Sequence, residues 1–247
     1  MNRTIFTMLV SVSFGSSLFV FAGPAPAFAE EADLDSLWAM EPLATRSGLP
    51  RFLGPEFQVE GAAAVLMDRL VQAGDPSDVR VALVDAIRRT NDDWSASMAD
   101  VLRSEPDASV RVAMVDALRY GDQAVALKAL EKAMKDEEAT VRTAAVRSVA
   151  YCEGADALGS QINELIRDFD ASVRSAATRT AGTLQLQSAW NELVWLSQDA
   201  DSENRLHAIR ALQRINPTKA ASQPEIQSLV DDVDAKVSRA ARQITGR

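Results

Sequence analysis

Hydrophobic and polar positions repeat along most of the chain at intervals of about 31 residues. Four copies contain a Val-Arg pair, and mostly apolar or small residues follow the first residue of the pair at three, four, seven and eight positions. Residues with this spacing lie on one face of an α-helix, so the pattern predicts an amphipathic helix in every copy. The pair stands at residues 79–80, 110–111, 141–142 and 173–174, and it degrades to Asn204-Arg205 and Val237-Ser238.

This repetition predicts a solenoid in place of a globular domain, because units of this length bury their apolar faces only against their neighbours. A second helical pattern precedes each Val-Arg helix, so every unit is expected to form a helical hairpin. Sustained two-residue alternation is not found, and we therefore expect no β-sheet. The predicted fold class is all-α, an α-solenoid of about six helical hairpins over residues 61–247.

An acidic residue precedes the valine by three positions in most units, within the turn that joins the two helices. An acid at this place accepts hydrogen bonds from the free amides at the start of the second helix and favours the positive end of its dipole. We therefore expect these acids to begin the second helices. They are Asp107, Glu138, Asp170, Asp201 and Asp234.

These features together resemble the short HEAT repeats, the HEAT-like type also seen in phycobilin lyases. The resemblance covers residues 61–247 and rests on the acidic turn, the Val-Arg pair, the small residue three positions later and Ala-Leu at the next turn. In that family the turn acid and the arginine form a ladder between neighbouring repeats. Carried onto this chain, the resemblance implies structural roles for Arg80, Arg111, Arg142, Arg174 and Arg205, bonded to acids such as Asp107, Glu138, Asp170 and Asp201.

The resemblance also implies that the second helices line a concave face, which makes their outward positions the candidate binding surface. We predict a groove that is acidic toward the first repeats and basic toward the last, able to orient a partner segment by charge. Its floor would be aliphatic, formed by Val81, Val84, Val112, Val115, Val146, Leu206 and Ile209. The alternative is a solvated face whose aliphatic residues are covered by arginine stems. The predicted partner-binding residues are Asp85, Arg88, Asp116, Arg119, Arg147, Arg179, Arg210 and Ile209.

The first residues of the chain follow the pattern of a secretory signal. Arg3 precedes an apolar run, and Ala27-Phe28-Ala29 fits the small-x-small cleavage rule, so residues 1–29 are predicted to be a signal peptide. An uncleaved membrane anchor is the alternative, but serine and glycine residues interrupt the run. We expect an exported chain, periplasmic in preference to secreted, with no integral membrane span after signal cleavage.

Residues 30–60 separate this signal from the array, and their dense proline and glycine content predicts little regular structure. We interpret them as an N-terminal extension or cap. Trp38 either covers the open apolar end of the first repeat, which terminal segments of solenoids must do, or anchors a partner.

Composition narrows the chemistry further. Asp and Glu outnumber Lys and Arg by 35 to 26, giving a net charge of −9, which argues against nucleic acid as a partner. The single histidine, His207, and the single cysteine, Cys152, fall in different repeats, so neither a Cys-His pair nor a metal cluster is indicated. His207 occupies a position that is Ala elsewhere, and Cys152 either packs as a small hydrophobe or pairs between chains. We expect no catalytic residue, metal or cofactor.

These expectations favour an exported, non-catalytic scaffold or adaptor that binds another, unidentified protein through the concave face of the solenoid. One alternative is a phycobilin-lyase-like enzyme or enzyme subunit. A second alternative is an assembly factor of an envelope complex.

Overall fold

A computed structural model describes residues 10–14, 17–21, 61–72 and 74–246 of the chain. The chain divides into two units, residues 1–49 and residues 50–247. Apart from residues 10–14 and 17–21, the predicted signal peptide lies outside the described residues. So does the predicted extension or cap at residues 30–60, together with Trp38.

In the first unit, two short strands form an antiparallel pair. Strand β1 (Val10–Phe14) pairs with β2 (Ser17–Phe21), with Val10 opposite Phe21 and Phe14 opposite Ser17. The expectation of no β-sheet is therefore wrong for this part of the chain. Residues 10–14 alternate Val, Ser, Val, Ser and Phe, the two-residue period of a strand, and β-branched and aromatic residues favour extended backbone.

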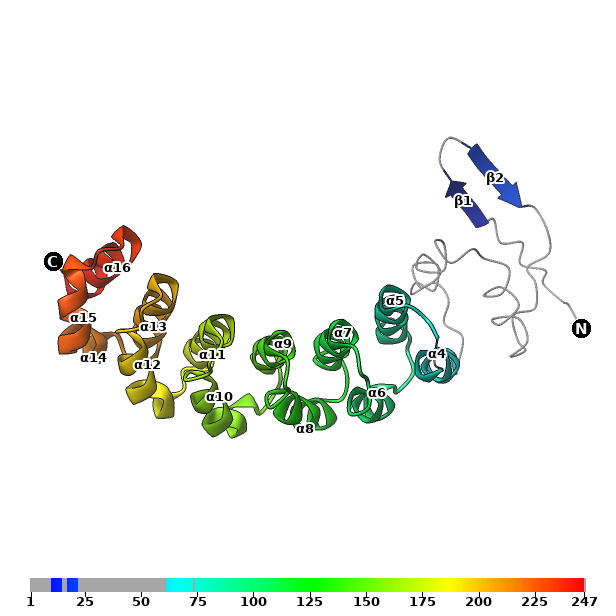
Figure 1. Cartoon of the computed structure of the whole chain (residues 1–247), viewed down its shortest axis with the longest axis horizontal. Coiled ribbons are helices and arrows are strands. Elements are labelled where there is room, and N and C mark those ends of the chain that lie inside the picture. Colours follow the sequence, from blue (N-terminus) through cyan, green and yellow to red (C-terminus); the bar gives the residue numbers. More distant parts are fainter. Residues whose placement is uncertain (1–9, 15–16, 22–60, 73, 247) are drawn as a thin grey trace, which may run out of the picture. The chain divides into compact units, whose positions relative to one another are not determined.

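The second unit is a row of helix pairs, which confirms the predicted α-solenoid (Figure 1). The first helices of the units are α4 (Ala62–Val71), α6 (Ser95–Leu102), α8 (Gln123–Ala133), α10 (Gly159–Leu165) and α12 (Trp190–Leu196). The second helices are α5 (Ser77–Arg88), α7 (Ala108–Leu118), α9 (Ala139–Val149), α11 (Ala171–Thr183), α13 (Ser202–Ile215) and α16 (Ala235–Thr245).

Shorter elements complete the later units. The 3₁₀ turns η1 (Ala155–Leu158) and η2 (Gln187–Ala189) precede α10 and α12. In the last unit, the first helix is broken into α14 (Pro217–Ser222), α15 (Pro224–Ser228) and η3 (Leu229–Asp231). Proline at the first helical position starts both short helices, because its missing N–H would have no partner there in any case.

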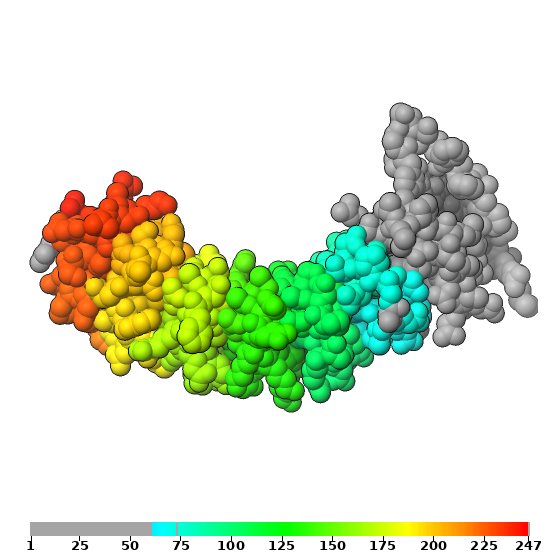
Figure 2. All heavy atoms as spheres, viewed as in Figure 1, coloured from blue at the N-terminus to red at the C-terminus, as the bar shows by residue number. Residues whose placement is uncertain are grey.

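Within the array, the second helices lie on the concave side and the first helices on the convex side (Figure 1). The space-filling view shows the same curve as a continuous hollowed surface (Figure 2). Among the described residues, no helix is long and apolar enough to span a membrane.

The apolar stripe of the second helices forms the core between repeats. The valines that begin the motif are buried, at 1% exposure or less in the five copies that retain valine. Small residues allow neighbouring second helices to approach closely. At Gly182 of α11, a Cβ atom would lie 2.9 Å from the Ala211 Cα of α13, so a side chain has no room at this contact.

The turn acids begin the second helices as expected in most units. Asp170 accepts hydrogen bonds from the amides of Ser172 (2.8 Å) and Val173 (3.3 Å), and Asp107, Asp201 and Asp234 cap their helices in the same way. Glu138 stands at the corresponding position of α9 but makes no side-chain capping bond.

Candidate functional site

A ladder of ion pairs links successive repeats along the edge where each first helix turns into the second. Each arginine of the Val-Arg motif reaches an acid in the turn of the next repeat, with N–O distances between 2.6 and 3.1 Å. The acid lies two residues before the capping position of that turn. The pairs are Arg80–Glu105, Arg111–Asp136, Arg142–Asp168, Arg174–Asp199 and Arg205–Asp232.

The five arginines thus lie along one edge, but the partners implied by the resemblance are wrong. The carboxylates of Asp107, Asp170 and Asp201 are turned toward the helix amides that they cap. The ladder acid of each turn instead accepts the amide of the capping residue, as Asp168 does from the Asp170 amide at 2.8 Å. Two acids in one turn therefore divide the work: one starts the helix and the other receives the arginine of the preceding repeat.

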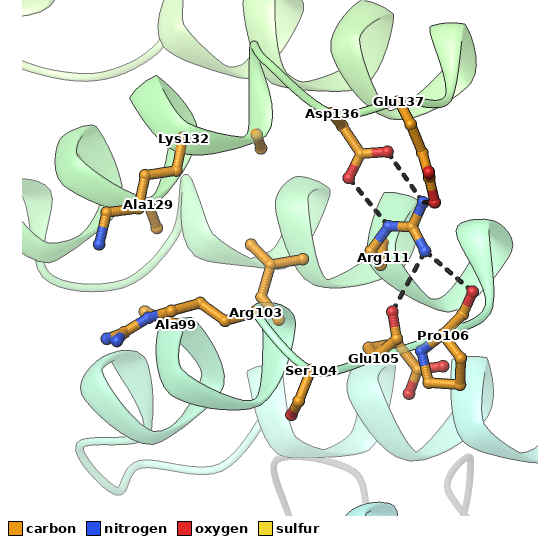
Figure 3. A pocket seen from close by; sticks show the side chains of 12 residues that line it. Ala99, Arg103, Ser104, Glu105, Pro106, Arg111, Ala129, Lys132, Asp136 and Glu137 are labelled. Carbon is orange, nitrogen blue, oxygen red and sulfur yellow. Dashed lines mark hydrogen bonds and ion pairs between the residues drawn. The ribbon is translucent and has the colours of Figure 1, made fainter.

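Four of the five ladder arginines, all but Arg80, also donate hydrogen bonds to backbone carbonyls of their own turn. Arg111 bonds both carboxylate oxygens of Asp136, at 2.8 and 2.9 Å, and donates to the carbonyls of Glu105 and Pro106 (Figure 3). Arg142 and Arg205 repeat the arrangement. Such bidentate pairs are the stronger class of charge-assisted hydrogen bonds, and they hold the turns of neighbouring repeats in register.

Ladder contacts shift the pKa of Arg111, Arg142, Arg205, Asp168 and Asp232 toward the charged form. The hydrogen bond to Asp136 raises the pKa of Arg111, and the hydrogen bond from Arg205 lowers the pKa of Asp232. Burial alone would raise the pKa of Asp168, but the hydrogen bonds from Arg142 and the Asp170 amide, together with nearby arginine charge, bring it below the ordinary value.

The predicted partner-binding residues lie on the second helices or, for Arg119, directly after one, and they differ in exposure. Those six residues after the valine are exposed from the second repeat onward, while Asp85, Arg88 and Arg119 are half-buried. Ile209 is buried at 0% exposure, so its assignment to the binding surface is wrong. The exposed residues of the set are Asp116, Arg147, Arg179 and Arg210.

Most of the expected aliphatic floor is also buried: Val84, Val115, Val146 and Leu206 are exposed by 3% or less. Of the other valines assigned to the floor, Val81 and Val112 are half-buried. Each inner second helix packs against a second helix on either side and a first helix beneath, so its buried face is wider than a stripe for one neighbour. The residue five after the valine belongs to that buried face.

The concave side carries arginines without a carboxylate partner. Five exposed arginines form no ion pair with any acid that the structure describes, whereas the ladder arginines are all paired. Helices α9 and α11 contain no acidic residue at all. The five are Arg147 of α9, Arg179 of α11, Arg210 and Arg214 of α13 and Arg239 of α16.

At the predicted acidic end of the concave side, Asp85 is paired with the neighbouring Arg88 and Arg89. Burial would raise the pKa of Asp85, but hydrogen bonds and charge from Arg88 (2.5 Å) and Arg89 (2.6 Å) lower it. Asp116 remains exposed and accepts a hydrogen bond from Ser148 at 3.2 Å. The surface is therefore basic over the later repeats and close to balanced over the first.

Two exposed tyrosines follow the ends of α7 and α9, and the sequence pattern did not single them out as surface residues. The Arg119 guanidinium lies 4.7 Å from the Tyr120 ring centre and 5.1 Å from that of Tyr151, and Arg88 lies 4.9 Å from Tyr120. Tyr120 is 57% and Tyr151 71% exposed. Their common position, ten residues after the valine in consecutive repeats, was the available signal; the helical pattern ends before it.

The single histidine lies at a contact between repeats, and the single cysteine is buried just after α9. His207 is half-buried with its Nδ1 2.9 Å from the Ser175 hydroxyl, and burial together with the charge of Arg179 lowers its pKa. Cys152 is a buried free thiol whose pKa burial raises. In the described part of the chain, no group of three or more His, Cys, Asp or Glu residues is placed to hold a metal ion.

An open cavity of about 530 Å³ lies between α6 and α8, next to the ladder (Figure 3). Ala99, Leu102, Ala129 and Ala133 line it, with the Arg111–Asp136 pair at the turns and the Arg103 and Lys132 side chains among its charged walls. The charged groups of that pair are engaged with each other, so they offer no free acid or base. Periodicity did not reveal the cavity, because it depends on the distance between two first helices.

Comparisons with known proteins agree with the fold. The sequence model of the HEAT repeats matches residues 160–244. No curated protein sequence matches significantly. A designed armadillo repeat protein, solved in complex with the peptide (KR)4, is similar in structure at a TM-score of 0.51 and 16% identity, and the match covers 80% of this chain and 98% of that one.

Two natural proteins are similar at lower scores. The complex of CpcE and CpcF of phycocyanin lyase from Nostoc sp. PCC7120 has a TM-score of 0.47 and 16% identity, covering 92% of this chain and 97% of that chain. Human deoxyhypusine hydroxylase, in complex with glycerol, has a TM-score of 0.41 and 18% identity, covering 87% and 83%.

The helix pairs, their ladder and the sequence match lead to the same description. Residues 160–244 match the HEAT repeats in sequence, and the helix pairs before them continue the same α-solenoid toward residue 61.

Proposed function

We propose that this chain is a non-catalytic protein-binding scaffold that holds a segment of another protein along the concave side of its later repeats. The observation that carries the proposal is the set of exposed arginines on α9, α11, α13 and α16 that have no acidic partner among the described residues. Arginine side chains held on rigid, packed helices offer a charge pattern that a partner can complement.

The shape of the array supports the same use. Solenoids expose long concave surfaces, and a partner can contact several repeats at once, so that modest contacts at each repeat add up. The designed armadillo repeat protein with a similar fold was solved with a short charged peptide, (KR)4. By analogy, a solenoid of this kind is suited to an extended and charged polypeptide segment.

We further propose that the chain acts outside the cytoplasm, with the periplasm favoured. The support is the sequence at residues 1–29, where Arg3, an apolar run and Ala27-Phe28-Ala29 fit an export signal. Mass spectrometry of the chain from cell fractions tests this. An N-terminus at Glu30 in the exported fraction is expected, and an intact N-terminus in the cytoplasmic fraction would contradict it.

The binding role is tested with two charge-reversal variants. In the first, Arg147, Arg179 and Arg210 are changed to Glu together. In the matched control, three exposed lysines of α8 and the turn that follows it, Lys128, Lys132 and Lys135, are changed to Glu, which alters net charge by the same amount. Affinity capture from native cells should lose its specific partner in the first variant and keep it in the second.

A captured partner that survives the arginine reversal would remove the concave side from the binding role. Circular dichroism of both variants checks that helicity is retained, so that loss of capture reports on the surface and not on unfolding.

A further inference from the structure

We propose that the segment held on the concave side is an acidic extended chain with a carboxylate at every third residue, aligned on Arg147, Arg179 and Arg210. This deepens the proposed binding role and rests on it. The three arginines occupy the same position, six residues after the start of the motif, in three successive second helices. All three are exposed and lack an acidic partner among the described residues.

The spacing of this arginine row follows from helix packing. Helix α11 packs directly against α9 on one side and α13 on the other. Packed helices lie about 8–10 Å apart, and corresponding side chains on a concave surface converge slightly toward the centre of curvature. The row therefore presents three guanidinium groups at intervals of about 9 Å.

An extended polyproline II chain matches this interval. It rises about 3.1 Å per residue with three residues per turn, so side chains on one face recur about every 9 Å. A β-strand places same-face side chains only about 7 Å apart, which falls out of register by the third arginine. The polyproline II conformation also leaves the backbone without internal hydrogen bonds, free to lie against the polar side chains of α9 and α11.

Charge sets the ends of the acidic segment. The residue equivalent to Arg147 in the preceding repeat is Asp116, which is exposed and would repel a carboxylate. Beyond Arg210, the exposed Arg214 and Arg239 continue the positive surface to α16. The occupant thus places its acids over the third to the sixth repeats and leaves the first two uncovered.

His207 lies close enough to Arg179 and Arg210 for their charges to affect its pKa. The half-buried His207 lies on α13. Burial is the largest cause of its lowered pKa, and the positive charges of Arg179 and Arg210 lower it further, while Glu203 and Asp201 oppose them. A carboxylate bound between these arginines offsets their charge. Binding is therefore expected to raise the pKa of His207, the only histidine in the sequence, which makes its imidazole resonance a specific reporter.

Two synthetic peptides of identical composition test the proposal on the purified full chain. In the spaced peptide, four Glu residues alternate with pairs of Pro and Ala residues; in the block peptide, the same four Glu residues are consecutive. Fluorescence anisotropy at low salt should give at least about tenfold tighter binding of the spaced peptide, and added salt should weaken it. A version with Lys in place of Glu should not bind.

The variants locate the site. Changing Arg147, Arg179 and Arg210 to Glu should abolish binding of the spaced peptide and the shift of the His207 resonance. Changing Lys128, Lys132 and Lys135 to Glu should preserve both. Equal binding of the two peptides, equal loss in both variants, or tighter binding of single-stranded DNA or anionic phospholipid vesicles would overturn the proposal.

The outcomes also separate this inference from the broader role. If the spaced peptide fails to bind while the arginine reversal still abolishes capture of the native partner, the acidic register is wrong and the scaffold role stands. If the spaced peptide fails to bind and the arginine reversal also leaves capture of the native partner unchanged, the concave side is not the binding surface.

Discussion

The ladder edge and the concave side both carry a row of arginines on the same second helices, and the two rows differ in what surrounds them. On α9, Arg142 is bound by both oxygens of Asp168 and by two carbonyls of its own turn, while Arg147, five residues later, is exposed without an acidic partner in the described chain. The role of an arginine on these helices therefore does not follow from its residue type. It depends on whether a carboxylate of the next repeat lies opposite it.

The largest expected effect comes from removing one ladder arginine. Arg142→Ala leaves Asp168 nearly buried and without its countercharge, so we expect a loss of about 3 kcal/mol in the free energy of unfolding. Arg147→Ala on the same helix should change it by less than about 0.5 kcal/mol. Urea denaturation followed by circular dichroism measures both, and similar losses in the two variants would erase the distinction between the rows.

A change at the contact between α11 and α13 should disturb both rows at once. In Gly182→Val, the added Cβ atom would lie 2.9 Å from the Ala211 Cα, which is too close for two carbon atoms. We therefore expect overpacking to cost about 1–3 kcal/mol. The exposed neighbour Thr183 provides the control, since Thr183→Ala removes little buried surface. Because the helices are pushed apart, the spaced peptide should also bind Gly182→Val more weakly; unchanged melting would contradict the close packing.

A smaller effect is expected at the capping position, where Asp170 bonds helix amides with its side chain and Glu138 does not. Asp170 caps α11 through two amides, so Asp170→Ala should cost about 1 kcal/mol. Glu138→Ala should cost less, because Glu138 makes no capping bond with its side chain. Thermal melts of the two variants test the order, and an equal loss would show that both acids act through the helix dipole alone.

The finest test uses acidity. The folded-state pKa of Asp232 is lowered, chiefly by the hydrogen bond from Arg205, so its contribution to stability is present above the unfolded pKa and is lost as pH falls through the folded pKa. Asp232→Asn should therefore be less stable than the unmodified chain at neutral pH, and the difference should shrink on acidification below about pH 4. Urea midpoints at several pH values measure this; a gap that widens in acid would contradict the sign.

The array could be predicted from the sequence because its signals are local and repeated. The stripe of Val, Ala and Leu predicted the second helices, and an acid before Val173 predicted where α11 begins. The exposure of Arg147, Arg179 and Arg210 also follows from helical phase alone. In contrast, the pairing of β1 with β2 was missed, although residues 10–14 alternate in the manner of a strand.

Only the tertiary structure decided which groups meet across repeats. Asp168 and Asp170 lie two residues apart in one turn, and the sequence does not say which carboxylate faces the helix amides and which faces Arg142. Ile209 looked exposed on an isolated helix, but a second helix on each side buries it. Local periodicity thus determined the elements and their caps, whereas burial and ion pairing depend on how neighbouring repeats stack, which no single repeat encodes by itself.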